Sequence, residues 1–223
     1  MPIVVFGSGA GMEAGLGHKD NYVSSSNTDR ARGSNIVLIY RLAIGSILMR
    51  FDISSIPPGS TIVSSVLSLL VEQFAGATNV PCHEFYTQWG STDFDAGADA
   101  EPPLDSAATW RFAFDAPTNT PYAGGAGLTA LDYNAVAEDT IALPIAGVWA
   151  TWNIPVMTQN WLTNNNGLFL PDLAAANVNN RFHSLDAVVP ANRPYLTVDY
   201  TVPSGIIRRQ SKIAIGISPS IGF

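Results

Sequence analysis

"SILMRFDISSIPPGSTIVSSVLSLLVEQF", residues 46–74, contains two apolar runs rich in β-branched side chains, separated by turn residues. The runs 46–53 and 61–74 have the composition of β-strands. Between them, Pro57–Gly59 cannot continue a central strand, because proline offers no N–H to the ladder and glycine favours a turn. The stretch therefore predicts two strands joined by a tight turn.

Segments of the same character lie on both sides of this pair and predict further strands at 35–41, 147–154, 166–171 and 195–202. One short helix is predicted at 155–162, where Pro155 suits the first turn. Val156 and Trp161 are expected to share its buried face. The helix should end at the turn signal Asn164–Gly167.

Many short strands, frequent turns and a single helix predict an all-β fold, an antiparallel β-sandwich of the jelly-roll type. The sandwich is expected over residues 20–202, between a glycine-rich N-terminal arm (1–19) and a C-terminal arm (203–223). Within it, residues 90–135 predict a long loop, of a length that is often functional. The predicted core includes Phe51, Ile62, Leu67, Leu69, Trp161 and Leu196.

The composition of the chain excludes several classes of protein. The 223 residues suit one domain, and with 47% hydrophobic and 13% charged residues a sizeable core is expected. The formal charge of −7 argues against a nucleic-acid partner. The single cysteine, Cys82, excludes an intrachain disulfide. No signal peptide and no apolar stretch of roughly 18 residues is found, so we expect a cytoplasmic product without a membrane partner.

The N-terminal segment contains a glycine motif that is typical of dinucleotide-binding domains. The apolar run Ile3–Phe6 leads into Gly9–Ala14, which fits the pattern G-x-G-x-x-A. A nucleotide site would need a long helix and a second buried strand next. Instead, two more glycines interrupt any helix, and residues 20–35 are polar. The sequence therefore favours an arm, and its predicted assembly contacts are Ile3, Val5 and Phe6.

Four segments carry a family resemblance: "NYVSSSN" (21–27), 47–71, 152–170 and 182–200. In this order and spacing they resemble the DNRLRE-type β-sandwich domain, which is related to alginate-binding carbohydrate-binding modules. The resemblance implies a non-catalytic module, usually attached to secreted enzymes or surface proteins. We expect no enzyme domain beside this module, which would be a departure from the family.

Catalytic motifs are weak. The three histidines lie far apart, and neither H-E-x-x-H nor G-x-S-x-G occurs. "RFHSLD" (181–186) brings a histidine, a serine and an aspartate together, but Ser184 lacks a nucleophile elbow. Cys82 is interpreted as a buried core thiol. We therefore expect no enzymatic activity.

One acidic segment is a candidate metal site. Carboxylates alternate with small residues around Gly97, and calcium takes several such oxygens from a flexible loop. Calcium is thus the one candidate cofactor, and the alternative is a solvated acidic loop. The candidate ligands are Asp93, Asp95, Asp99 and Glu101.

The tryptophans divide into two groups. Trp89 and Trp110 flank the long loop and are candidates for stacking on sugar rings. Trp149 and Trp152 differ by three positions, so they face opposite sides of a strand. We expect Trp149 and Trp161 to lie in the core.

The C-terminal arm combines basic charge with apolar alternation. Its only charged residues are Arg208, Arg209 and Lys212, and they suit an acidic partner surface. Its isoleucines at positions 213, 215 and 217 share one face of a strand, which could extend a neighbouring sheet. The alternative is an arm that folds back on its own domain. The predicted assembly contacts here are Arg208, Arg209, Lys212, Ile213, Ile215 and Ile217.

These features favour a non-enzymatic structural protein of a larger assembly. The specific hypothesis is a capsid decoration or cement protein of a bacterial virus, located in the virion. Its partners would be other copies of itself and a capsid or shell protein. The alternative is a carbohydrate-binding module on a cell or virion surface, with a polysaccharide as partner. A polysaccharide-active enzyme is a third, weaker hypothesis.

Overall fold

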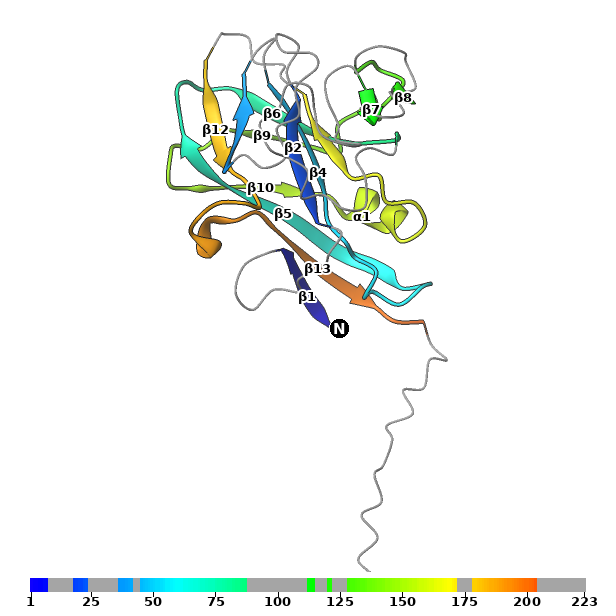
Figure 1. The fold of residues 1–223 in the computed structure, drawn as a ribbon. Helices are drawn as coiled ribbons and strands as arrows, with labels where there is room; N and C mark the ends of the chain where they lie inside the picture. Colours follow the sequence, from blue (N-terminus) through cyan, green and yellow to red (C-terminus); the bar gives the residue numbers. More distant parts are fainter. Residues whose placement is uncertain are drawn as a thin grey trace, which may run out of the picture.

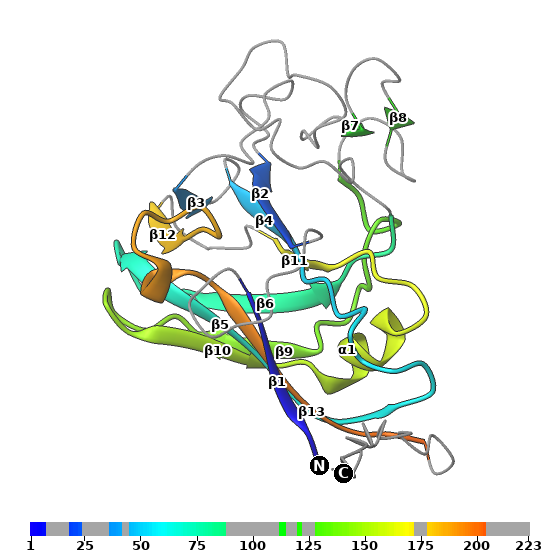
Figure 2. The same ribbon diagram turned by 60° about the horizontal axis from the view of Figure 1, so that its bottom comes forward.

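The computed structural model describes residues 1–7, 18–23, 36–41, 45–87, 112–114, 120–121, 128–171 and 178–203. Two antiparallel sheets pack face to face (Figures 1 and 2), which confirms the predicted all-β sandwich. No helix among the described residues is long and apolar enough to span a membrane.

The first sheet is built around the long strand β5 (Thr61–Gln73). Its order is β1 (Ile3–Gly7), β13 (Tyr195–Thr201), β5, β12 (Asn180–His183) and β3 (Val37–Tyr40), and β10 (Trp149–Asn153) also pairs with β5. The second sheet has the order β2 (Lys19–Val23), β4 (Ser46–Arg50), β11 (Leu168–Leu170), β6 (Asn79–Glu84) and β9 (Asp139–Ala142). A separate ribbon pairs β7 (Phe112–Phe114) with β8 (Thr120–Pro121).

The connection between β4 and β5 is the turn that the sequence predicts. Gly59 has a φ of 78°, a conformation that glycine adopts without strain. The N–H of Ser60 donates to the carbonyl of Pro57 at 3.1 Å. All six predicted core residues are buried: Phe51, Ile62, Leu67, Leu69, Trp161 and Leu196.

The two tryptophans of β10 take the opposite faces to those predicted. Trp152 is fully buried, and its indole Nε1 donates to the Val80 carbonyl of the second sheet at 2.8 Å. Trp149 is half-buried on the outer face of the first sheet. The register explains this, because Trp152 lies opposite the core residue Leu67 whereas Trp149 lies opposite Leu70. The prediction that Trp149 is a core residue was wrong.

Helix α1 (Pro155–Trp161) forms where predicted, with proline in its first turn. Its buried face carries Met157, Thr158 and Trp161, whereas Val156 is 65% exposed. Val156 and Trp161 are five positions apart and therefore do not share a helix face, so that prediction was wrong. A short 3₁₀ helix, η1 (Pro190–Asn192), precedes β13.

The first residues of the expected N-terminal arm belong to the sandwich instead. β1 pairs with β13 along its whole length, and Phe6 is 1% exposed within the core. The His18 ring packs edge-on against Phe6 and Phe51, with centroid distances of 6.5 and 5.6 Å. His18 Nδ1 accepts a hydrogen bond from the Asp52 N–H at 2.8 Å. Phe6 is therefore a core residue of its own domain and not an assembly contact.

Candidate interaction surface

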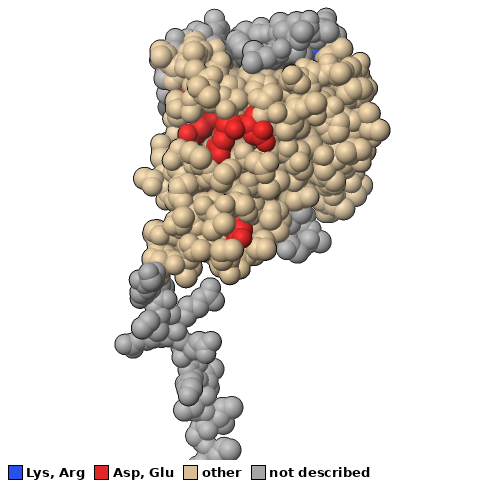
Figure 3. All heavy atoms as spheres, turned by 180° about the vertical axis from the view of Figure 1, so that it is seen from behind, with Lys and Arg blue, Asp and Glu red and all other residues tan. Residues whose placement is uncertain are grey.

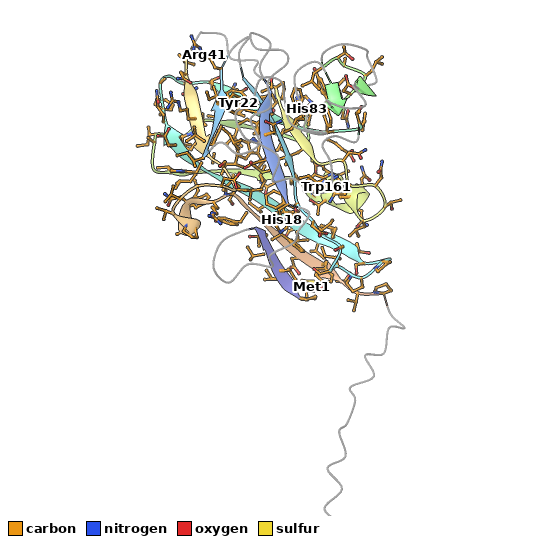
Figure 4. All side chains as sticks on the ribbon, viewed as in Figure 1. Met1, His18, Tyr22, Arg41, His83 and Trp161 are labelled. Atoms are coloured by element: carbon orange, nitrogen blue, oxygen red, sulfur yellow. The ribbon has the colours of Figure 1, made fainter. Side chains whose placement is uncertain are left out.

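Among the described strands, β1 is an edge strand of the first sheet. The label Met1 in Figure 4 marks the N-terminal end of this strand. The Tyr200 N–H donates to the Pro2 carbonyl at 3.3 Å, so Pro2 and Tyr200 form a hydrogen-bonded pair. Such pairs alternate along an antiparallel ladder. It follows that Ile3, Val5 and Gly7 direct their backbone N–H and C=O groups away from β13. We call this row of backbone groups the open edge of β1.

Within the described part of the chain, the open edge lacks the usual protection of a sheet edge. Natural edge strands carry charges, prolines or bulges that prevent another strand from pairing. The sequence of β1, IVVFG, contains none of these, and its register with β13 is regular. The outer strands of the second sheet differ, since β2 contains Lys19 and Asp20 and β9 contains Asp139. β3 is also uncharged, but it lies against β2 and β4 of the other sheet.

Side chains beside the open edge are mainly apolar. Ile3 is 66% exposed, and Val5 is half-buried. The only charged side chain of β1 and β13 is Asp199, which lies opposite Ile3. Asp199 Oδ1 is buried and accepts no hydrogen bond from the described residues. The edge is therefore apolar with one acidic side chain beside it.

The outer face of the same sheet carries a pair of aromatic rings. Trp149 and Tyr195 meet edge to face, with ring centroids 4.9 Å apart and an interplanar angle of 64°. Both side chains are half-buried. Ser68 and Thr151 follow Tyr195 across the sheet in register; the Ser68 side chain is buried, and Thr151 is exposed. Aromatic rings beside hydroxyl groups suit a partly wet contact surface.

A cleft of about 310 Å³ lies where α1 ends, between the turn after β4 and the turn after α1. Its lining includes Asp52, Trp161 and Asn165. Trp161 Nε1 and Asn165 Oδ1 are buried and find no partner among the described residues. Burial opposes ionisation of Asp52, but hydrogen bonds from Ser54 and the nearby positive charge of Arg50 act against it, and the pKa of this carboxyl is lowered.

Acidic side chains gather on the face shown in Figure 3. Glu138 accepts hydrogen bonds from the N–H groups of Val156 and Met157, both at 2.7 Å, and so caps α1. Asp139 Oδ2 accepts from the Asn153 N–H at 2.8 Å. Burial raises the pKa of Glu138, and its helix contacts offset this in part. These carboxylates hold the fold together, and no metal-ligating group of three or more residues occurs in the described part of the chain.

A cysteine, a serine and a histidine, which are residue types that often take part in catalysis, lie in buried or hydrogen-bonded positions in the sandwich. Cys82 is fully buried, and burial raises the pKa of its thiol well above the ordinary value. Ser184 is also fully buried, and its Oγ accepts from the Asp186 N–H at 3.0 Å. His83 Nδ1 lies 2.6 Å from the Asn134 carbonyl, and burial lowers the pKa of this imidazole.

Several predicted sites fall outside the described residues, and their predictions stand as made from the sequence. They are the calcium candidates Asp93, Asp95, Asp99 and Glu101, the stacking candidates Trp89 and Trp110, and the arm residues Arg208, Arg209, Lys212, Ile213, Ile215 and Ile217. Sequence reasoning missed the open edge of β1, although the apolar run Ile3–Phe6 was its signal. It also missed Trp149 and Tyr195 as a pair, because their contact depends on the pairing of β10, β5 and β13.

The described residues form a β-sandwich in which β1 is an edge strand. No model of a known protein family matches the chain, and no curated protein matches it. The resemblance to the DNRLRE-type domain therefore remains a prediction from the sequence.

Proposed function

We propose that this chain is a non-enzymatic structural protein of a larger assembly and that it associates through the open edge of β1. The observation that carries the proposal is the row of outward backbone groups on an uncharged, regular edge strand. Such an edge is a template for strand addition, in which main-chain hydrogen bonds supply affinity.

The energetics of the edge support this role. A strand added to β1 would cover Ile3 and Val5 as well as the outward backbone groups. Burying one large aliphatic side chain contributes about 1.5–3 kcal/mol. Because β1 is already held by β13 and by Phe6 in the core, little ordering entropy is lost when a partner binds.

The more specific form of the proposal is a capsid decoration or cement protein of a bacterial virus, located in the virion. Its partners would be other copies of the chain and a capsid or shell protein. A rigid sandwich with an edge for strand addition suits that task, and the basic arm of the sequence suits an acidic neighbour.

Sedimentation velocity on the full chain tests the proposal. The wild type should form species larger than a monomer as concentration rises, and Ile3→Lys should return it to the monomer. Val156→Lys is the matched control, because Val156 is 65% exposed on α1, far in sequence from the edge. A wild type that stays monomeric, or equal effects of the two lysines, would refute the role of the edge.

A second candidate function is carbohydrate binding, which the Trp149–Tyr195 ring pair favours. Sugar rings stack on exposed aromatic faces while their hydroxyls bond to neighbouring polar groups. Titration with alginate and other polysaccharides should quench tryptophan fluorescence if this surface binds them. Trp149→Ala should abolish the quenching, and an unchanged titration for this variant would exclude the ring pair.

A further inference from the structure

We infer that the open edge of β1 is occupied by residues 213–217 of a second copy of this chain, paired antiparallel to β1. The inference rests on the proposed function, since it names the partner of the same edge. The donor segment lies outside the described residues, and its sequence alone identifies it as the partner strand.

The donor segment matches the acceptor in length and character. β1 has five residues, and 213–217 has five, with isoleucine at alternate positions. Alternation places the three isoleucines on one face of an added strand. There they would continue an apolar row of the sheet beyond β1.

Topology favours a donor from another molecule. Every described ladder between named strands is antiparallel, so we expect the same of the added strand. A strand antiparallel to β1 runs parallel to β13, which precedes it in the chain. In such a sheet β1 would lie between β13 and the donor segment. Residues 202–212 of the same chain would have to run back along the sheet and pass around β1, with a length close to the shortest crossover, about a dozen residues, that parallel strands use.

The position at which β13 ends also favours a donor segment from another molecule. The Tyr200 N–H donates to the Pro2 carbonyl, so β13 ends beside the beginning of β1. An antiparallel strand on β1 must begin beside Gly7, at the other end. The arm of its own chain would have to cross back over the sheet first, whereas a second copy can present the segment directly.

Charge supports the pairing of two copies. Residues 204–223 contain Arg208, Arg209 and Lys212 and no acid. All 18 acidic residues lie in the rest of the chain, and one of them, Asp199, stands beside the open edge. Opposite net charge on arm and body accelerates encounter between copies.

Complementation between two full-length variants tests the inference. The first variant, Val5→Pro, loses only the acceptor edge, because the Val5 N–H points away from β13 and is not part of its own ladder. Ile3→Lys serves as a second edge variant should Val5→Pro unfold. The second variant carries Ile213→Ser, Ile215→Ser and Ile217→Ser and loses only the donor segment. The matched control for it is Ile206→Ser with Ile207→Ser in the same arm.

Sedimentation should show each variant alone as a monomer, whereas an equimolar mixture should give a species of twice the monomer mass. The arm control should associate like the wild type. The inference is overturned if the mixture stays monomeric, or if the serine variant associates unaided. If the serine variant associates unaided but Ile3→Lys still abolishes association, the proposed function stands, and a different segment occupies the open edge of β1. A wild type that never associates would overturn both.

Discussion

Ile3 lies directly opposite Asp199 in the ladder between β1 and β13, so the most exposed aliphatic side chain of β1 stands beside the only charged side chain of the two strands. This arrangement combines a hydrophobic contact with an electrostatic bias. It favours a partner that brings both apolar side chains and positive charge, and it gives the open edge of β1 a property that can be measured separately from its hydrogen bonds.

Asp199→Asn should weaken self-association and reduce its dependence on salt, because the acidic side chain beside the edge is removed. The wild type should associate less as ionic strength rises from low to physiological values. Sedimentation at several salt concentrations measures both effects. Glu72→Gln, at an exposed position of β5, is the control. An equal salt dependence for all three proteins would show that Asp199 has no part in association.

Trp152→Phe should lower the free energy of unfolding by about 2–4 kcal/mol, because it removes a buried hydrogen bond to Val80 and leaves a cavity. Trp149→Phe should cost no more than about 1 kcal/mol, since Trp149 lies on the outer face and is half-buried. Urea denaturation of both variants compares the two costs. Similar values would contradict the assignment of Trp152 to the core.

Glu138→Ala should destabilise the protein by about 1–2 kcal/mol, because two N–H groups in the first turn of α1 lose their acceptor. Glu138→Gln should recover part of this loss, since its single amide oxygen still accepts. Thermal unfolding measures the order of the three proteins. Equal melting temperatures for Glu138→Ala and the wild type would show that this contact contributes nothing.

Asp20→Asn should stabilise the protein at neutral pH. Burial raises the pKa of Asp20 well above its ordinary value, although the Leu185 N–H offsets this in part. The folded state therefore holds this proton more tightly than the unfolded state, and stability is lost as pH rises through the raised pKa. Below about pH 4, where the carboxyl is protonated in both states, the advantage of asparagine should vanish. Urea denaturation at pH 3.5 and pH 7 checks this, and an advantage independent of pH would contradict it.

Local patterns predicted the strands and the turn well because those signals lie within a few residues. The strands β4 and β5, the turn at Gly59 between them and the buried Leu67 and Leu69 all follow from strand composition, turn chemistry and alternation. Local patterns failed where the outcome depends on a distant partner. Alternation alone indicates that Trp149 and Trp152 face opposite ways, but only the register with β5 determines which one is buried.

The N-terminal strand shows the same limit. The run Ile3–Phe6 is visible as an apolar segment, but its partner β13 lies at the other end of the described chain. Nothing in the local sequence indicates that pairing, and the glycines that follow favour an arm. The open edge of β1, on which the proposed function rests, could therefore emerge only from the three-dimensional arrangement of the strands.

Amide hydrogen exchange within β1 tests the central claim most directly, because one strand contains both the probe and its control. The N–H groups of Val4 and Phe6 point toward β13 and should be protected at every concentration. Those of Ile3, Val5 and Gly7 point outward and should exchange fast in dilute, monomeric protein. When concentration is raised until the sedimenting mass doubles, we predict that the outward amides become protected. Fast exchange of Ile3, Val5 and Gly7 in the associated state would contradict assembly through the open edge of β1.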